Sequence, residues 1–189
     1  LENKCDEHLN RMYRLFSKIE NGLEPIAKLI KEYIEEKGKS IINAYKNVLK
    51  EKEKDNKSNS EFIQNLIKLH QHCNKMVHDQ FGHNLLFQTA MKDAFEVFLN
   101  MDVGDYSNVE LLAKYCDQFL RTGGKKMIEE QVGQELEKVV KLFTYLNDKD
   151  LFVEIYRNLL AKRLLNKRSS SDYAERIMVG KLKLSCGTQ

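Results

Sequence analysis

Apolar side chains recur every three or four residues along most of the chain, and this spacing constrains the fold more than any other feature. Because an α-helix has 3.6 residues per turn, residues at such intervals line one side of a helix. No stretch alternates apolar and polar residues as a half-buried strand does, and the 189 residues include one proline. The sequence therefore predicts an all-α fold. The first stripe consists of Leu1, Cys5, His8, Met12, Leu15 and Ile19.

Five helices are expected before a boundary from Asn100 to Ser107, which includes Gly104. The first should end at Glu20-Asn21-Gly22, where Asn and Gly tolerate left-handed backbone. The second should begin near Pro25 and end at Gly38, and a third should follow from about residue 41. The polar run 50–60 is expected to be a frayed helix end and an exposed loop. The fourth and fifth helices are expected on either side of a turn at Gly82.

Four more helices are expected after the boundary. Ser107 and Glu110 have the spacing of a capping box, which satisfies free backbone N–H groups at a helix start. Asp148 is expected to cap a helix over residues 149–166 with two apolar rows, which predicts contact with more than one helix. The last helix is expected over residues 172–186.

Bulk composition excludes several classes of protein. Apolar residues make up 42% of the chain, which is enough for a packed core, and charged residues of both signs make up 31%. The net charge of +3 is too weak to indicate nucleic acid or an anionic membrane as the main partner. No apolar run approaches the roughly 20 residues of a membrane span. The first residue is not Met and lies within a helical pattern, so we expect a segment of a longer protein.

The cysteines and histidines do not form a recognisable reactive site. Cys5, Cys73, Cys116 and Cys186 are far apart, which is typical of reduced, mostly buried thiols in a cytosolic or nuclear protein. His70 and Cys73 share a helix face, but no third ligand completes it, so no metal site is expected. We expect His70, His72, His78 and His83 to be ordinary surface or boundary residues. The sequence predicts no catalytic residue and no cofactor.

The strongest local charge feature is a basic cluster at the end of the eighth expected helix. It consists of Lys162, Arg163, Lys167 and Arg168. One interpretation is a solvated helix end, where cations complement the helix dipole. The other is a docking patch for an acidic partner, or for acidic side chains elsewhere in the full protein.

Several ordered motifs resemble those of the cullin family. They are MYRLF at 12–16, GLEP at 22–25, LLAKYCD at 111–117, YLNDKDLF at 145–152, YRNLLAKRLL at 156–165 and KLKLSCG at 181–187. Tyr173 departs from the family pattern, which usually has an acidic residue there. The first two motifs are closest to those of SCF-type cullins, which use Skp1 and F-box proteins.

The resemblance implies an architecture. Cullins have a stalk of five-helix repeats, followed by a globular region that starts with a four-helix bundle. Residues 1–104 are expected to form the third cullin repeat, an elongated unit of five helices. Residues 105–189 are expected to form the first part of the C-terminal cullin-homology bundle.

The resemblance also implies a function. The chain is expected to be part of the non-catalytic scaffold of a cytoplasmic and nuclear ubiquitin ligase. Expected partners of the full protein are a RING-box protein, a Skp1-like adapter with an F-box receptor, Nedd8 and a Cand-type inhibitor. The adapter and Nedd8 sites are expected outside this chain.

One set of residues in the family motifs is expected to build the bundle, and some of them to face a partner protein. They are Lys149, Asp150, Phe152, Tyr156, Leu160, Ala161, Lys162, Arg163 and Leu164.

Three alternatives stay open at this point. A helical protein-interaction domain unrelated to ubiquitin would have no division into a rod and a bundle. A nucleic-acid binder would use the basic cluster and lose affinity steeply with salt. A hydrolase would need a nucleophile, a base and an orienting group, which the sequence does not bring together.

Overall fold

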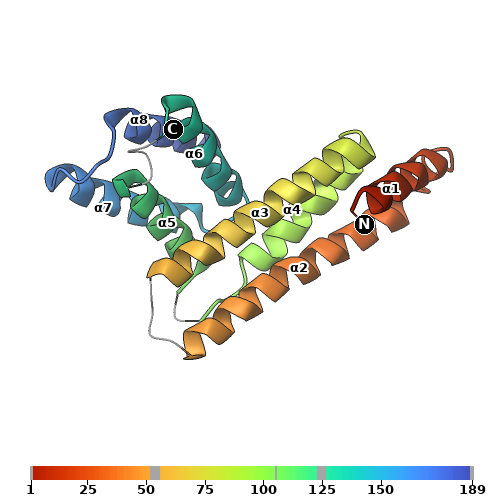
Figure 1. Ribbon diagram of the computed structural model, residues 1–189, viewed down its shortest axis with the longest axis horizontal. Helices are drawn as coiled ribbons and strands as arrows, with labels where there is room; N and C mark the ends of the chain where they lie inside the picture. The colour runs from red at the N-terminus through yellow and green to blue at the C-terminus, as the bar shows by residue number, and fades with distance from the viewer. Residues whose placement is uncertain (1, 52–55, 105, 123–126, 188–189) are drawn as a thin grey trace.

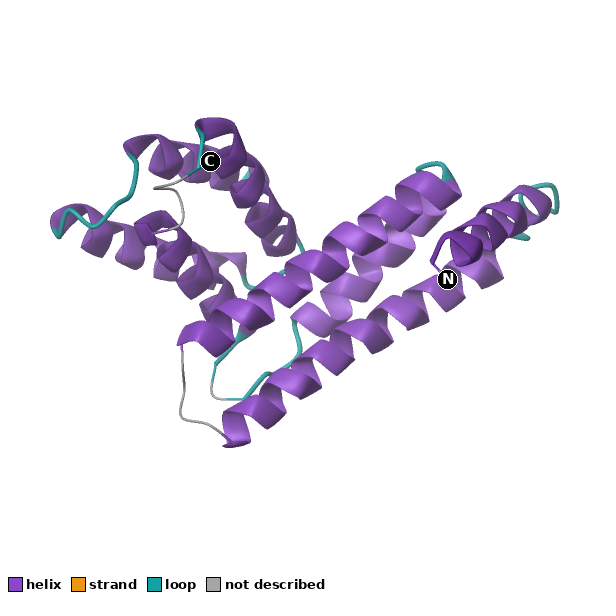
Figure 2. Cartoon of the chain, viewed as in Figure 1, coloured by secondary structure: helices purple, strands orange, loops and turns teal. Residues whose placement is uncertain are grey.

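The computed structural model describes residues 2–51, 56–104, 106–122 and 127–187. Within these ranges the regular structure consists of helices, which confirms the all-α class (Figure 2). The helices are α1 (Glu2–Phe16), α2 (Glu24–Glu51), α3 (Asn56–Phe81), α4 (Leu85–Leu99), α5 (Asn108–Thr122), α6 (Glu129–Thr144), α7 (Lys149–Leu165) and α8 (Asp172–Cys186).

The helices form two groups (Figure 1). In the first, α2, α3 and α4 run side by side as an elongated layer, and α1 packs against α3. In the second, α5 pairs with α7 and α6 pairs with α8. Helix α3 contacts both α5 and α6, so it joins the two groups. We call the first group the rod and the second the bundle; the domain boundary at residue 104 stays a prediction.

The expectation that Gly38 ends a helix is wrong. Helix α2 is 28 residues long in total and runs through Gly38 without a break. The described rod therefore has four helices where five were expected. A Cβ atom at this position would lie 2.3 Å from Cδ1 of Phe98 on α4. The glycine therefore allows α2 and α4 to approach closely. A glycine within a helical pattern can mark such a close contact as well as a helix end.

The first helix also differs from the expected pattern. Helix α1 ends at Phe16, and Asn21 has a φ of 56°, the left-handed conformation predicted for this turn. Leu15 and Ile19 are 54% and 59% exposed, and His8 is exposed as well, so the predicted stripe is wrong at these three positions. Leu1 and the side chain of Cys5 lie outside the described residues. The side chains that pack on the core are Leu9, Met12 and Tyr13.

Part of the polar run expected to be a loop is helical. Helix α3 begins at Asn56, so residues 56–60 belong to it, whereas residues 52–55 lie outside the described ranges. The turn expected at Gly82 is present, with a φ of 54°.

Local sequence signals fix the starts of the bundle helices. The amide of Ser107 donates to the Glu110 carboxylate over 3.1 Å, and the amide of Glu110 donates to the Ser107 hydroxyl over 3.2 Å, which confirms the capping box. The Asp148 carboxylate accepts from the amide of Leu151 over 3.0 Å, as predicted for a cap.

Aromatic side chains fill much of the core. In the rod, Phe81 and Phe87 stack with ring centroids 4.1 Å apart, and Tyr13 packs edge-on against both. In the bundle, the centroids of Phe143 and Phe152 are 4.8 Å apart, and both side chains are fully buried. Such close-packed interiors resist deformation. Within the described ranges, no helix combines the length and apolarity needed to span a membrane.

Candidate functional site: the joint between rod and bundle

Asn100, the residue after α4, ties the end of the rod to the bundle. Its side-chain amide donates to the carbonyl of Tyr145 over 2.9 Å and to the carbonyl of Glu96 over 2.7 Å. Its side-chain carbonyl accepts from the amide of Asn147 over 2.8 Å. One side chain thus satisfies backbone groups on α4 and in the α6–α7 turn, which fixes the position of that turn against the rod.

An aromatic contact reinforces this connection. The Tyr145 hydroxyl lies 3.0 Å from Nε2 of His70 on α3, and both rings pack against the fully buried Phe95. Burial, together with the nearby Lys141, lowers the pKa of His70 to about 4. The imidazole is therefore neutral near pH 7, and a neutral ring suits this largely apolar contact.

Asn108 secures the connection between α4 and α5. Its side chain is 4% exposed and donates to the carbonyl of Leu99 over 2.8 Å, at the end of α4. It also lies 3.3 Å from the carbonyl of Met101. The first of these bonds satisfies a carbonyl that the end of α4 leaves without an intrahelical partner. We use the name joint for His70, Asn100, Asn108, Tyr145 and Asn147.

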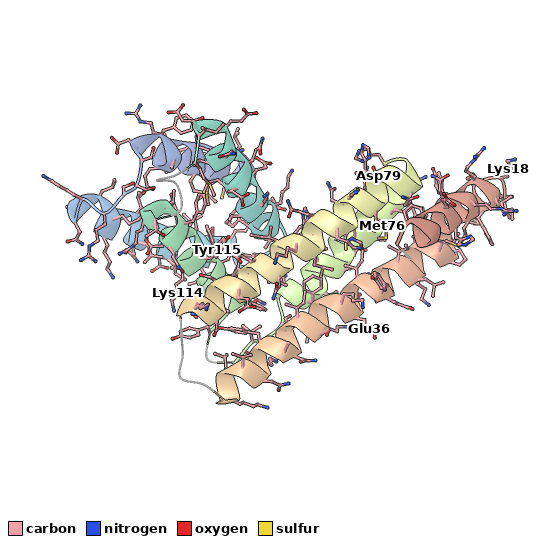
Figure 3. All side chains as sticks on the ribbon, viewed as in Figure 1. Lys18, Glu36, Met76, Asp79, Lys114 and Tyr115 are labelled. Atoms are coloured by element: carbon pink, nitrogen blue, oxygen red, sulfur yellow. The ribbon has the colours of Figure 1, made fainter. Side chains whose placement is uncertain are left out.

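Helix α5 is also fastened to α3. The Ser60 hydroxyl donates to the side-chain carbonyl of Gln118 over 2.7 Å. Lys114, which Figure 3 labels on α5 beside Tyr115, places its ammonium 3.8 Å from the ring centre of Tyr106. The Lys114–Tyr106 contact joins α5 to the segment just before it. The Ser60–Gln118 bond lies on a different part of α3 from His70, so two separated attachments oppose rotation of the bundle about α3.

A buried ionic network holds the bundle together. The Arg163 side chain is fully buried, and its guanidinium donates to both oxygens of Glu175 over 2.8 and 2.9 Å. It also donates to Asp117 over 2.5 Å. Asp117 in turn pairs with Arg121 at 2.7 Å, and Ser169 donates to Glu175 over 2.8 Å. Two cations and two anions balance, as a buried cluster of charges requires.

The electrostatics of Arg163 follow from these partners. Burial by itself lowers the pKa of this guanidinium, but the hydrogen bonds to Glu175 and Asp117 outweigh burial, so the pKa is raised. The side chain remains charged, and it connects α7 to α5 and α8.

The basic cluster predicted from the sequence is therefore divided. The interpretation as a solvated helix end is wrong for Arg163 and holds for Lys162, Lys167 and Arg168, which are exposed. Arg163 binds acidic side chains, as the other interpretation allowed, but those side chains belong to this chain.

The structure places the residues of the predicted bundle set in two groups. Phe152, Tyr156 and Arg163 are buried and Leu160 packs against the core, so these four contribute to the bundle, whereas Lys149 is half-buried at the start of α7. The other four are exposed on α7: Asp150, Ala161, Lys162 and Leu164. A contact of any of them with a partner protein stays a prediction.

Two thiols have the inert character expected from the sequence. Cys73 and Cys116 are fully buried, and burial raises the pKa of each thiol to about 12. A protonated thiol is a poor nucleophile. The expectation that Cys186 is a core thiol is wrong, because Cys186 is exposed at the end of α8. The side chain of Cys5 lies outside the described residues.

Sequence analysis missed most of the joint. His70 was expected to be an ordinary surface or boundary residue, and Asn100 only the start of a boundary. Glu175 was not connected with Arg163. A capping box has a local signal, but the partners of Asn100 and Arg163 lie up to 47 and 46 residues away in the chain.

The comparisons with known proteins agree with the all-α fold. The family described as the cullin alpha solenoid domain matches residues 1–189. Curated relatives include Cullin-1 of Oryza sativa subsp. japonica, which is 41% identical, and Cullin-2 of Arabidopsis thaliana, which is 40% identical, each over the whole chain. Cullin-3A of Arabidopsis thaliana is 36% identical, again over the whole chain. The chain spans 26% of the first two relatives and 24% of the third. On these findings, the chain belongs to the cullin family.

Proposed function

We propose that this chain is part of the rigid, non-catalytic scaffold of a cullin-RING ubiquitin ligase of the SCF type. The observation that carries the proposal is the joint, in which Asn100 binds the α6–α7 turn through both ends of its amide. Membership of the cullin family gives this rigidity a purpose, because a scaffold must fix the distance between the parts that it holds.

Rigidity acts through effective concentration. A scaffold that holds a substrate adapter at one end and a RING-bound conjugating enzyme at the other converts their encounter into a constrained, intramolecular one. A loose joint would spread the two ends over many separations and lower the productive fraction. The bond-forming chemistry would belong to the partners, and this chain would supply geometry.

The partners follow from the proposed role. The full protein would bind a RING-box protein, a Skp1-like adapter with its F-box receptor, Nedd8 and a Cand-type inhibitor, in the cytoplasm and nucleus. Since the chain spans about a quarter of its relatives, the adapter and Nedd8 sites are expected in other parts of the full protein. The exposed residues of the predicted bundle set, such as Lys162 and Leu164 on α7, are candidates for partner contacts.

The test uses the full-length parent protein, assembled with a RING-box protein, an adapter and a substrate receptor. Asn100→Ala removes the amide that links α4 to the α6–α7 turn. We expect assembly to be unchanged and ubiquitin transfer to the substrate to slow by several-fold, because the ends are held less precisely. Asn43→Ala is the matched control, since Asn43 is exposed on α2.

Two results would count against the proposal. If the parent protein fails to bind any RING-box protein, the alternative of a helical interaction domain unrelated to ubiquitin gains support. If Asn100→Ala and Asn43→Ala transfer ubiquitin equally fast while the joint is shown to be loosened, rigidity at this joint is not the function.

A further inference from the structure

Three cations line one side of the end of α1. They are Arg11, Arg14 and Lys18, spaced by three and four residues. Lys18 follows the end of α1, but its amide donates to the carbonyl of Leu15 over 3.3 Å, and this turn keeps Lys18 on the same side as the two arginines. All three side chains are exposed. None of them makes an ion pair with another described residue. Three unneutralised charges on one short surface attract an anionic partner.

The same three cations border an open cleft between α1 and the end of α3. Gln80 of α3 forms part of its wall, and the Asn10 amide lies 3.5 Å from the Gln80 carbonyl. Among the described residues that line the cleft, Glu7 is the one acidic residue against three cations. Asp79, labelled at the far end of α3 in Figure 3, is paired with His78 at 2.5 Å. The cleft is therefore predominantly basic.

Apolar side chains flank this basic cleft. Leu15, Phe16 and Ile19 are 54%, 40% and 59% exposed, and Leu15 also lines the cleft. A nucleic acid backbone offers phosphates but no apolar side chains for such a flank, and the net charge of +3 is weak for that partner. A protein segment that carries both acidic and apolar side chains would match both features.

We propose that the surface formed by Arg11, Arg14, Lys18, Leu15 and Ile19 docks an acidic amphipathic segment of a partner protein. The carboxylates of this segment pair with the arginines, and its apolar side chains cover Leu15 and Ile19. We call this surface the α1 dock. It lies on the opposite side of α3 from the bundle in Figure 1, so it does not depend on the joint or on the proposed scaffold function.

The probe is a fluorescein-labelled peptide of about 18 residues, built from Glu, Leu and Ala, with Glu and Leu on adjacent helical stripes. Fluorescence anisotropy measures its Kd for the chain. We expect Arg11→Gln with Arg14→Gln to weaken binding by about tenfold or more. We expect Lys18→Gln to weaken it by a few-fold and, because this residue follows the helix, to leave α1 intact.

The matched control variant removes two arginines elsewhere. Arg157→Gln with Arg176→Gln changes the net charge equally, and both residues are exposed on the bundle. This variant should bind the peptide within about twofold of the unaltered chain. Control peptides are a scrambled sequence of the same composition and a version with Gln in place of Glu, and both should bind at least tenfold more weakly.

Three outcomes would overturn the proposal. Equal weakening in the two double-arginine variants would mean diffuse charge attraction with no defined dock. Equal affinity for the scrambled peptide would mean that the arrangement of Glu and Leu on adjacent stripes plays no part in binding. Tighter binding of an oligothymidylate that is lost in the Arg11 and Arg14 variant would assign the surface to nucleic acid instead.

Discussion

The close contact between Gly38 and Phe98 gives a prediction with an unusual sign. Replacing an exposed mid-helix glycine with alanine normally stabilises a protein by about 0.5–1 kcal/mol. At position 38 the new Cβ would lie 2.3–2.5 Å from three ring carbons of Phe98, more than 1 Å inside ordinary contact. The Phe98 ring is fully buried and packs on Phe95 at 4.8 Å, so it has little room to move. Overpacking of this kind costs about 1–3 kcal/mol, occasionally more.

We take the overpacking cost near the upper end of that range, about 3 kcal/mol, and subtract the gain of about 1 kcal/mol from the higher helix propensity of alanine. Gly38→Ala should therefore destabilise the chain by about 2 kcal/mol. Thermal unfolding followed by circular dichroism should show a fall in Tm of about 4–8 °C. Gly180→Ala is the matched control, because Gly180 lies within α8 and a Cβ there would meet nothing within 4 Å. The control should raise Tm by about 1–4 °C.

A double-mutant cycle isolates the contact. Phe98→Leu removes the ring that a Cβ at position 38 would strike, so Gly38→Ala should cost less in that background than in the unaltered chain. If Gly38→Ala stabilises the chain as Gly180→Ala does, α2 does not approach α4 at this point, and the explanation for the continuous α2 is refuted.

Three further predictions concern buried groups. Arg163→Met leaves the Glu175 carboxylate buried without its partner and should cost about 3–5 kcal/mol in urea unfolding, and adding Glu175→Met should recover part of that loss. The pKa of His70 is lowered from 6.5 to about 4. Between these two pH values the unfolded state binds one proton more than the folded state, so the free energy of unfolding should fall by up to about 3 kcal/mol as the pH drops from about 6.5 to 4. His70→Phe should remove most of this pH dependence. Maleimide labelling read by peptide mass should modify Cys186 rapidly and leave Cys73 unmodified in the folded chain, and rapid labelling of Cys73 would contradict its burial.

Local and periodic features could be predicted from the sequence. The all-α class, the capping box at Ser107 and Glu110 and the Asp148 cap follow from residues three or four positions apart, and the structure confirms each one. Such signals depend on backbone geometry that a few neighbouring residues determine.

Features that depend on distant partners could not be predicted in this way. The residues around Gly38 look the same whether the glycine ends a helix or makes room for an aromatic ring of another helix. That ring belongs to Phe98, which is 60 positions further along the chain. Arg163 stands among exposed cations in the sequence, and its burial is decided by Asp117 and Glu175 on other helices. The residues of the joint are ordinary polar residues until the fold brings them together.

The central claim is that the joint holds the rod and the bundle at one fixed relative position. Spin labels at Lys18 and Lys162, both exposed and in different groups, would report their separation by double electron–electron resonance, with Cys5 and Cys186 replaced by serine. A fixed joint predicts one narrow distance distribution that broadens in Asn100→Ala. A broad or two-peaked distribution in the chain with an intact joint would contradict the account.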